Sequence, residues 1–129
     1  MTDEPWTWPA FAAAIVASAV FALIVHELGH VLAAGALGGE RFRVVVAWPA
    51  LRVEADLPEG RGASLSFLAA GALANLGGAA ALYGTSEKMA LPAVLQIVVA
   101  LLALAPIGTS DGARILAELK LLASRQEFE

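Results

Sequence analysis

The chain has 129 residues, of which 59% are hydrophobic and 16% are charged, and its mean hydropathy is +0.74. An average soluble domain is roughly 45–50% apolar, so this composition favours a protein that lies in a lipid bilayer. The net charge of −4, with no block of basic residues, argues against nucleic acid as a partner. The lack of cysteine excludes disulfides and thiolate metal ligands.

The first apolar run covers about residues 9–37, which is long enough for a helix that crosses the hydrocarbon core. The N-terminal segment "MTDEPWTWP" has no Lys or Arg, unlike the start of a cleaved signal peptide, so we expect this helix to be retained. Trp6 and Trp8 would lie at the membrane interface, which indole rings favour.

Three titratable residues stand near the middle of this run, in the segment "VHELGH": His26, Glu27 and His30. Positions four apart in a helix differ by about 40° around its axis, so the two histidines point the same way and suit one zinc ion. Glu27 lies about 100° from His26 and can reach a metal-bound water as a general base. This is the H-E-x-x-H arrangement of zinc hydrolases.

The alternative for these three residues is a structural polar cluster that hydrogen-bonds to neighbouring helices. A carboxylate at the centre of a membrane helix costs about 3 kcal/mol, and the Leu, Ile, Val and Phe residues of 9–25 offset roughly 2–5 kcal/mol. The apolar side chains therefore offset the free-energy cost of inserting Glu27, with only a small excess. Because ionisable residues inside membranes are commonly functional, we favour the metal site.

A stretch of different character follows the first run. Side chains alternate with period two over residues 42–47 and again over 51–56, on either side of the segment "WPA". This pattern predicts a β-hairpin over about residues 41–57. An isolated hairpin is marginal in water, so we expect it to rest on the helices or on the membrane interface.

Two further uncharged runs predict membrane spans over about residues 62–85 and 89–108. The expected fold is therefore an all-α membrane protein with a single domain over residues 1–129. Its core would be three transmembrane helices, and the small hairpin would lie between the first two.

The second run contains the amide side chain of Asn75, and the third run contains that of Gln96. Asn75 can simply hydrogen-bond across helices, beside small residues such as Gly71, Gly77 and Gly78 that favour close packing. We interpret Gln96 in the third run as structural.

Asp111 follows the third run, at the start of a helix expected over about residues 111–124. A catalytic zinc site usually has three protein ligands and a water, and the topology brings Asp111 to about the same depth as His26 and His30. The alternative is that Ser110 or Asp111 only caps the helix. Spacing alone does not decide between the two.

The basic residues indicate an orientation. One side of the three-span topology carries all of them except Lys88: Arg41, Arg43, Arg52, Arg61, Arg114, Lys120 and Arg125. Since cytoplasmic segments carry the excess of Lys and Arg, we expect the hairpin and the C-terminal helix in the cytoplasm and the N-terminus outside. The protein would be a multi-pass protein of a prokaryotic cytoplasmic membrane.

Three segments together resemble a known family. "HELGH", "AAGALANLGG" and "PIGTSDGARIL" are similar to the three-helix core of the site-2 protease family, which are intramembrane zinc metalloproteases. The resemblance runs from about residue 20 to 118. The chain departs from the family at Ser110, where leucine is usual, and at Leu76, where proline often follows the asparagine.

The resemblance implies roles for five residues. His26, His30 and Asp111 would bind Zn²⁺, and Glu27 would activate the water. Asn75 would help to bind the substrate or the oxyanion.

The resemblance also implies a role for the hairpin. A peptide bond inside a transmembrane helix is shielded by the hydrogen bonds of that helix, so the substrate has to unwind before cleavage. An edge strand can then bind the freed backbone by β-addition, and Val44, Val45 and Val46 are the residues that we expect to do so. The alternative is a hairpin that only covers the bundle.

The sequence therefore predicts an intramembrane zinc metalloprotease that cleaves membrane-protein substrates within or near their transmembrane segments. Its partners would be the lipid bilayer, the substrate, and a membrane protein or a second copy. The alternative is a non-proteolytic subunit of a membrane complex, which the short chain favours and the complete set of ligands and base opposes. A metal transporter would need more ligands along a path through the bilayer.

Overall fold

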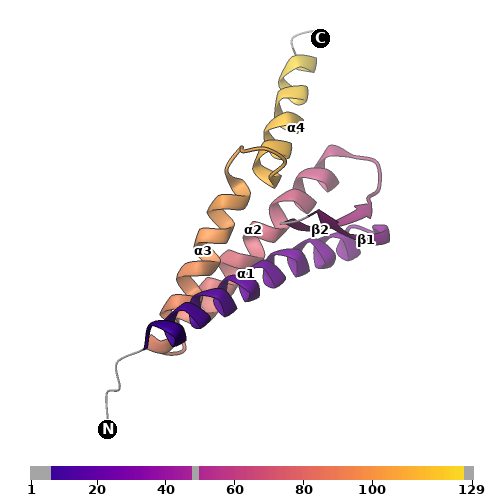
Figure 1. The fold of residues 1–129 in the computed structure, drawn as a ribbon. Coiled ribbons are helices and arrows are strands. Elements are labelled where there is room, and N and C mark those ends of the chain that lie inside the picture. Colours follow the sequence, from indigo (N-terminus) through magenta and orange to yellow (C-terminus); the bar gives the residue numbers. More distant parts are fainter. Residues whose placement is uncertain (1–6, 48–49, 127–129) are drawn as a thin grey trace.

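The structure, a computed structural model, describes residues 7–47 and 50–126 (Figure 1). Its elements are α1 (Trp8–Ala36), β1 (Glu40–Ala47), β2 (Ala50–Asp56), α2 (Arg61–Tyr83), the short 3₁₀ helix η1 (Glu87–Met89), α3 (Ala90–Leu104) and α4 (Asp111–Gln126). The fold is mostly helical with one small antiparallel sheet between the first two helices, as the sequence predicts. Trp6, Trp48 and Pro49 lie outside the described residues.

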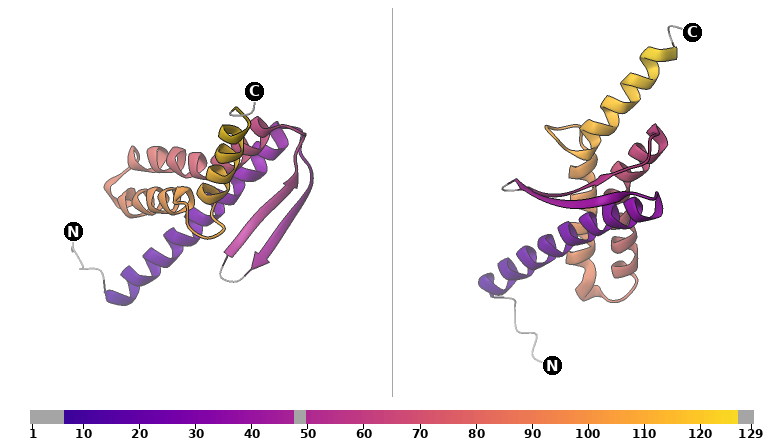
Figure 2. Two further views of the ribbon diagram at one scale, coloured as in Figure 1. Left: turned by 90° about the horizontal axis from the view of Figure 1, so that it is seen from above. Right: turned by 90° about the vertical axis from the view of Figure 1, so that its right-hand side faces the viewer.

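Helices α1, α2 and α3 pack against one another as a bundle (Figure 2). The side chains buried between them are mostly small: Ala22, Ala34, Ala72, Ala79, Ala93 and Ala100. Many large apolar side chains point outward instead, among them Leu23, Leu32, Leu73, Leu101 and Leu102. Small residues let helix backbones approach closely, which is typical of membrane helices. By length and composition, α1, α2 and the segment Glu87–Leu104 are apolar enough to cross a membrane.

The third helix ends at Leu104, before the predicted end near residue 108. Ala105 adopts an extended conformation with ψ of 131°, because it precedes Pro106 and a proline disfavours the helical conformation of the residue before it. Gly108 then takes a positive φ of 59°, which glycine adopts without steric cost. The chain thereby turns sharply, and α4 begins at Asp111.

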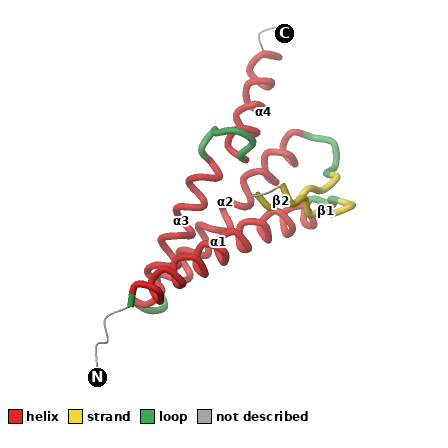
Figure 3. The backbone as a smooth tube through the Cα atoms, viewed as in Figure 1, coloured by secondary structure: helices red, strands yellow, loops and turns green. Residues whose placement is uncertain are grey.

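The hairpin pairs β1 with β2 in antiparallel register, with Val44 opposite Val53 and Val45 opposite Arg52. Val53 is only 4% exposed, since the β2 side of the hairpin rests on α1. The hairpin lies crosswise near the end of the bundle from which α4 projects (Figures 2 and 3). The fold thus brings α1, α2, the hairpin and the start of α4 together in one region.

A candidate metal centre

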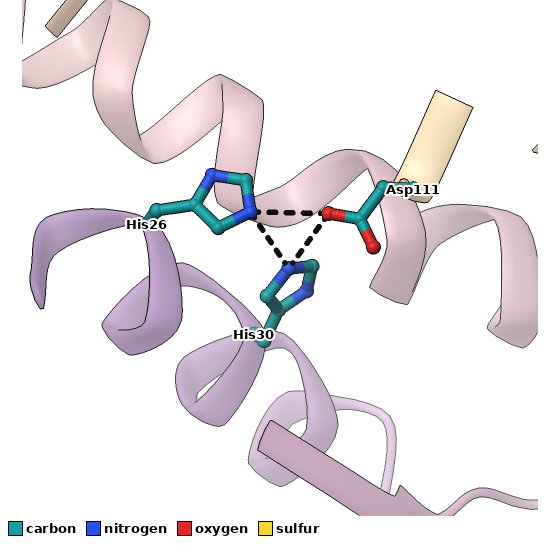
Figure 4. Close-up of side chains that lie close together, drawn as sticks. All are labelled: His26, His30 and Asp111. Atoms are coloured by element: carbon teal, nitrogen blue, oxygen red, sulfur yellow. Dashed lines mark hydrogen bonds and ion pairs between the residues drawn. The ribbon is translucent and has the colours of Figure 1, made fainter. Parts of the chain in front are cut away.

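Two histidines of α1 and the aspartate at the start of α4 form a compact cluster (Figure 4). Oδ2 of Asp111 lies 3.0 Å from Nε2 of His26 and 3.1 Å from Nε2 of His30. The two Nε2 atoms are 3.2 Å apart. Both histidines are buried, and Asp111 is half-buried. Residues 81 to 85 positions apart in the chain therefore meet in one site.

The cluster fits a small divalent metal ion. Its donor atoms, two imidazole nitrogens and one carboxylate oxygen, are the set found in catalytic zinc sites with three protein ligands. Zinc bonds of about 2.0–2.1 Å at tetrahedral angles separate neighbouring donors by about 3.3 Å, and the three distances in the cluster are close to that value. His26, His30 and Asp111 could thus hold a metal ion.

Helix α2 supports the histidines from behind, and its ribbon passes behind both rings in Figure 4. His30 Nδ1 donates a hydrogen bond of 2.8 Å to the carbonyl oxygen of Phe67. In a neutral imidazole this bond keeps the proton on Nδ1, so that Nε2 can bind a metal. Gly71, one turn further along α2, lies so close that a Cβ there would be 2.6 Å from Nε2 of His26 and 2.7 Å from Nε2 of His30.

Asn75 lies one turn beyond Gly71 and contacts His26. It is 0% exposed, and its amide nitrogen lies 3.5 Å from Nδ1 of His26. The amide oxygen has no hydrogen-bond partner among the described residues. The substrate or oxyanion role that the resemblance implies for Asn75 stays a prediction, since the only polar contact of its side chain among the described residues is with His26.

Asp111 is free to face the histidines because Ser110 caps α4. The Ser110 hydroxyl accepts a hydrogen bond of 3.2 Å from the N–H of Ala113, as an N-cap side chain does. Burial raises the pKa of the Asp111 carboxyl, but the hydrogen bonds and charge of His26 and His30 outweigh burial, so this pKa lies well below its usual value. The lowered pKa favours the ionised carboxylate, which only accepts hydrogen bonds.

Glu27 lies on α1 between the two histidines and contacts the hairpin. Its Oε2 atom accepts a hydrogen bond of 2.8 Å from the backbone N–H of Val53. The N–H groups along an antiparallel strand point alternately toward the partner strand and away from it. The N–H of Val53 donates to Glu27, so it belongs to the edge of β2 that faces away from β1. Sequence patterns could not identify this contact, because every residue except proline carries the same donor.

A cavity of about 530 Å³ opens beside the cluster. Glu27, both histidines and Asp111 lie in its wall. The rest of the lining is mainly apolar and comes from α1, β1, α3 and the loop before α4: Leu23, Val45, Val99, Leu102, Ala103, Thr109 and Ser110, with Arg52 of β2. The volume is in the range of ligand sites in proteins. The polar side chains of the cluster and of Glu27 therefore face a cavity whose other walls are mainly apolar.

The three valines predicted to bind a substrate strand have different surroundings. The Val45 side chain lines the cavity, whereas Val44 and Val46 are 63% and 70% exposed and point to the other face of the hairpin. This difference follows from the alternation of side chains along a strand. The strand edge that contacts Glu27 belongs to β2.

Comparison with family models, curated proteins and solved structures found no match to this chain. The resemblance to the site-2 protease family therefore rests on the matched residues alone.

Proposed function

We propose that this chain is an intramembrane zinc metalloprotease of the site-2 protease type. The observation that carries the proposal is the convergence of His26, His30 and Asp111 in one cavity wall with Glu27 beside them. Three helices of the bundle have the length and composition of membrane spans. The four chemical groups match those that peptide hydrolysis at a zinc site requires.

Each group has a distinct task in the proposed reaction. Zinc, when bound by His26, His30 and Asp111, would supply Lewis-acid chemistry for water and the substrate carbonyl. Glu27 takes a proton from the attacking water as the water oxygen bonds to the carbonyl carbon. Glu27 then gives this proton to the peptide nitrogen as the C–N bond breaks. The Val53 N–H holds the Glu27 carboxylate at a fixed position for both transfers.

The cavity suits an apolar, extended substrate. Five of its lining residues are Leu, Val or Ala, and such side chains exclude water and match the residues of a transmembrane segment. A helical segment has to unwind to expose one peptide bond to Glu27. We propose that the bilayer supplies the substrate laterally and that the chain lies in the membrane with its N-terminus outside.

The first test is the zinc content of protein purified in detergent. We expect about one zinc per chain in the wild type, since one three-ligand cluster is present. The Asp111→Ala and His26→Ala variants should lose most of the metal. Glu27→Gln should keep it, because Glu27 is not one of the three ligands.

The second test is cleavage. Proteoliposomes that contain bacterial membrane proteins are incubated with wild-type protein or with Glu27→Gln, and new N-termini are identified by mass spectrometry. We expect new N-termini within or near transmembrane segments only with the wild type. Zinc binding without any such cleavage would favour a non-proteolytic metal-binding subunit, and a wild type that binds no zinc would refute the proposal.

A further inference from the structure

Helix α2 presents three groups to the histidines at intervals of four residues: the Phe67 carbonyl, Gly71 and Asn75. Residues four apart share one face of a helix. The Phe67 carbonyl accepts the Nδ1 proton of His30 over 2.8 Å, and Gly71 lets the helix approach both rings. Asn75 stands opposite Nδ1 of His26, in the position that corresponds to the Phe67 carbonyl for His30.

The orientation of the Asn75 amide decides which tautomer His26 adopts. With its nitrogen toward His26, the amide donates to Nδ1, and the imidazole proton has to sit on Nε2. Nε2 is the atom that faces Asp111 and His30, so that tautomer cannot offer a lone pair to a metal. The same orientation leaves the buried amide oxygen without a partner, which costs free energy.

A half-turn of the amide about its Cβ–Cγ bond removes the conflict over the tautomer. The oxygen then accepts the Nδ1 proton of His26, and the Nε2 lone pair points into the cluster. We propose that Asn75 is a positioning residue, which holds His26 in the Nδ1–H tautomer through its amide oxygen and so prepares Nε2 for the metal. This inference rests on the proposed metal site but not on proteolysis.

Zinc affinity tests this role separately from cleavage. Loss of a group that orients a metal-bound histidine typically lowers metal affinity about 10–100-fold, and we expect such a loss in Asn75→Leu. Asn75→Asp should restore the affinity, because a carboxylate oxygen can accept the same proton. Gln96→Leu is the matched control, since Gln96 is another fully buried amide that packs against Gly78. Its side chain makes no hydrogen bond to the cluster within the described chain.

The imidazole protons give a second measurement that needs no activity. The sequence has two histidines, so ¹⁵N-histidine labelling yields two rings in NMR spectra of both metal-free and zinc-loaded protein. We expect both rings to carry a protected Nδ1–H in the wild type. Asn75→Leu should lose the protected proton of His26 and keep that of His30, whose partner is a backbone carbonyl.

The outcomes separate the possible roles of Asn75. Unchanged zinc affinity in Asn75→Leu, together with a protected His26 Nδ1–H, would overturn the proposal and favour a substrate or oxyanion role. An equal loss of affinity in Gln96→Leu would show that any buried amide matters and would also overturn it. If the wild type shows no protease activity, the affinities and the NMR signals still decide the role of Asn75.

Discussion

The backbone N–H of Val53 in β2 donates a hydrogen bond of 2.8 Å to Oε2 of Glu27 in α1. The hairpin is therefore attached to the proposed general base itself. A backbone donor in a strand is positioned by the ladder hydrogen bonds on the other edge of that strand. Glu27 consequently gains a fixed orientation that a long side chain does not have alone.

Replacing Val53 by proline should slow cleavage while the metal stays bound. Proline removes only the outward N–H, which is not part of the β1–β2 ladder, and edge positions tolerate proline. A hydrogen bond to a charged group contributes about 1.5–3 kcal/mol, so we expect the cleavage rate to fall about tenfold to a hundredfold. Zinc content and cleavage rate, measured on the same preparation, check this expectation.

The control for Val53→Pro is Ala55→Pro. By the alternation of an antiparallel strand, the N–H of Ala55 lies on the same edge of β2 as that of Val53. Glu27 accepts its hydrogen bond from Val53, not from Ala55. Ala55→Pro should leave the cleavage rate close to that of the wild type. Equal losses in the two variants would mean that distortion of the hairpin, rather than the bond to Glu27, is responsible.

Gly71 is expected to be essential for metal binding. A Cβ at this position would lie 2.6 Å from Nε2 of His26 and 2.7 Å from Nε2 of His30. Gly71→Ala therefore pushes both rings out of place, and overpacking of this kind costs about 1–3 kcal/mol. Zinc affinity, measured by competition with a chelator, should fall at least about tenfold.

Gly77→Ala is the matched control for Gly71→Ala in the same helix. A Cβ at Gly77 would meet no atom within 4 Å, and alanine favours a helix by about 1 kcal/mol over glycine. We expect unchanged zinc affinity and slightly higher thermal stability. A drop in zinc affinity in both variants would point to a general effect on α2.

Gly112 sets the position of Asp111. A Cβ at Gly112 would overlap the backbone carbonyl of Leu104 at the end of α3. Gly112→Ala should shift the start of α4 and move the Asp111 carboxylate away from the histidines, so zinc content should fall. Gly62→Ala, at the corresponding second position of α2 with nothing within 4 Å, should bind zinc normally. Normal zinc content in Gly112→Ala would contradict this role.

The sequence predicts the elements well because their signals are local. Long uncharged runs, a period-two stretch around "WPA", and proline near the end of a run each depend on neighbouring residues. The H-E-x-x-H spacing is local as well, and helix geometry alone places His26 and His30 on one face. The hairpin and the helices therefore lie close to their predicted bounds, apart from the end of α3 at Leu104.

The groups around the cluster could not be predicted in the same way. Phe67 and Val53 act through backbone atoms that every sequence provides, so no side-chain pattern marks them. Spacing also did not decide whether Asp111 binds a metal or whether Ser110 or Asp111 only caps α4. The structure separates them, since Ser110 bonds the helix N-terminus and Asp111 turns to the histidines.

Membrane insertion and orientation can be tested with single cysteines, because the chain contains none. Ser86, Leu101 and Ser124 are all exposed on the protein surface. In intact bacterial cells, a membrane-impermeant maleimide should label Ser86→Cys, and it should label Ser124→Cys only after the cells are opened, since basic segments stay in the cytoplasm. Leu101→Cys should resist labelling in both cases, because lipid would cover the exposed side chain at this position. Labelling of Leu101→Cys in native membranes would contradict a membrane-embedded α3, and the reverse pattern for the two serine variants would contradict the proposed orientation.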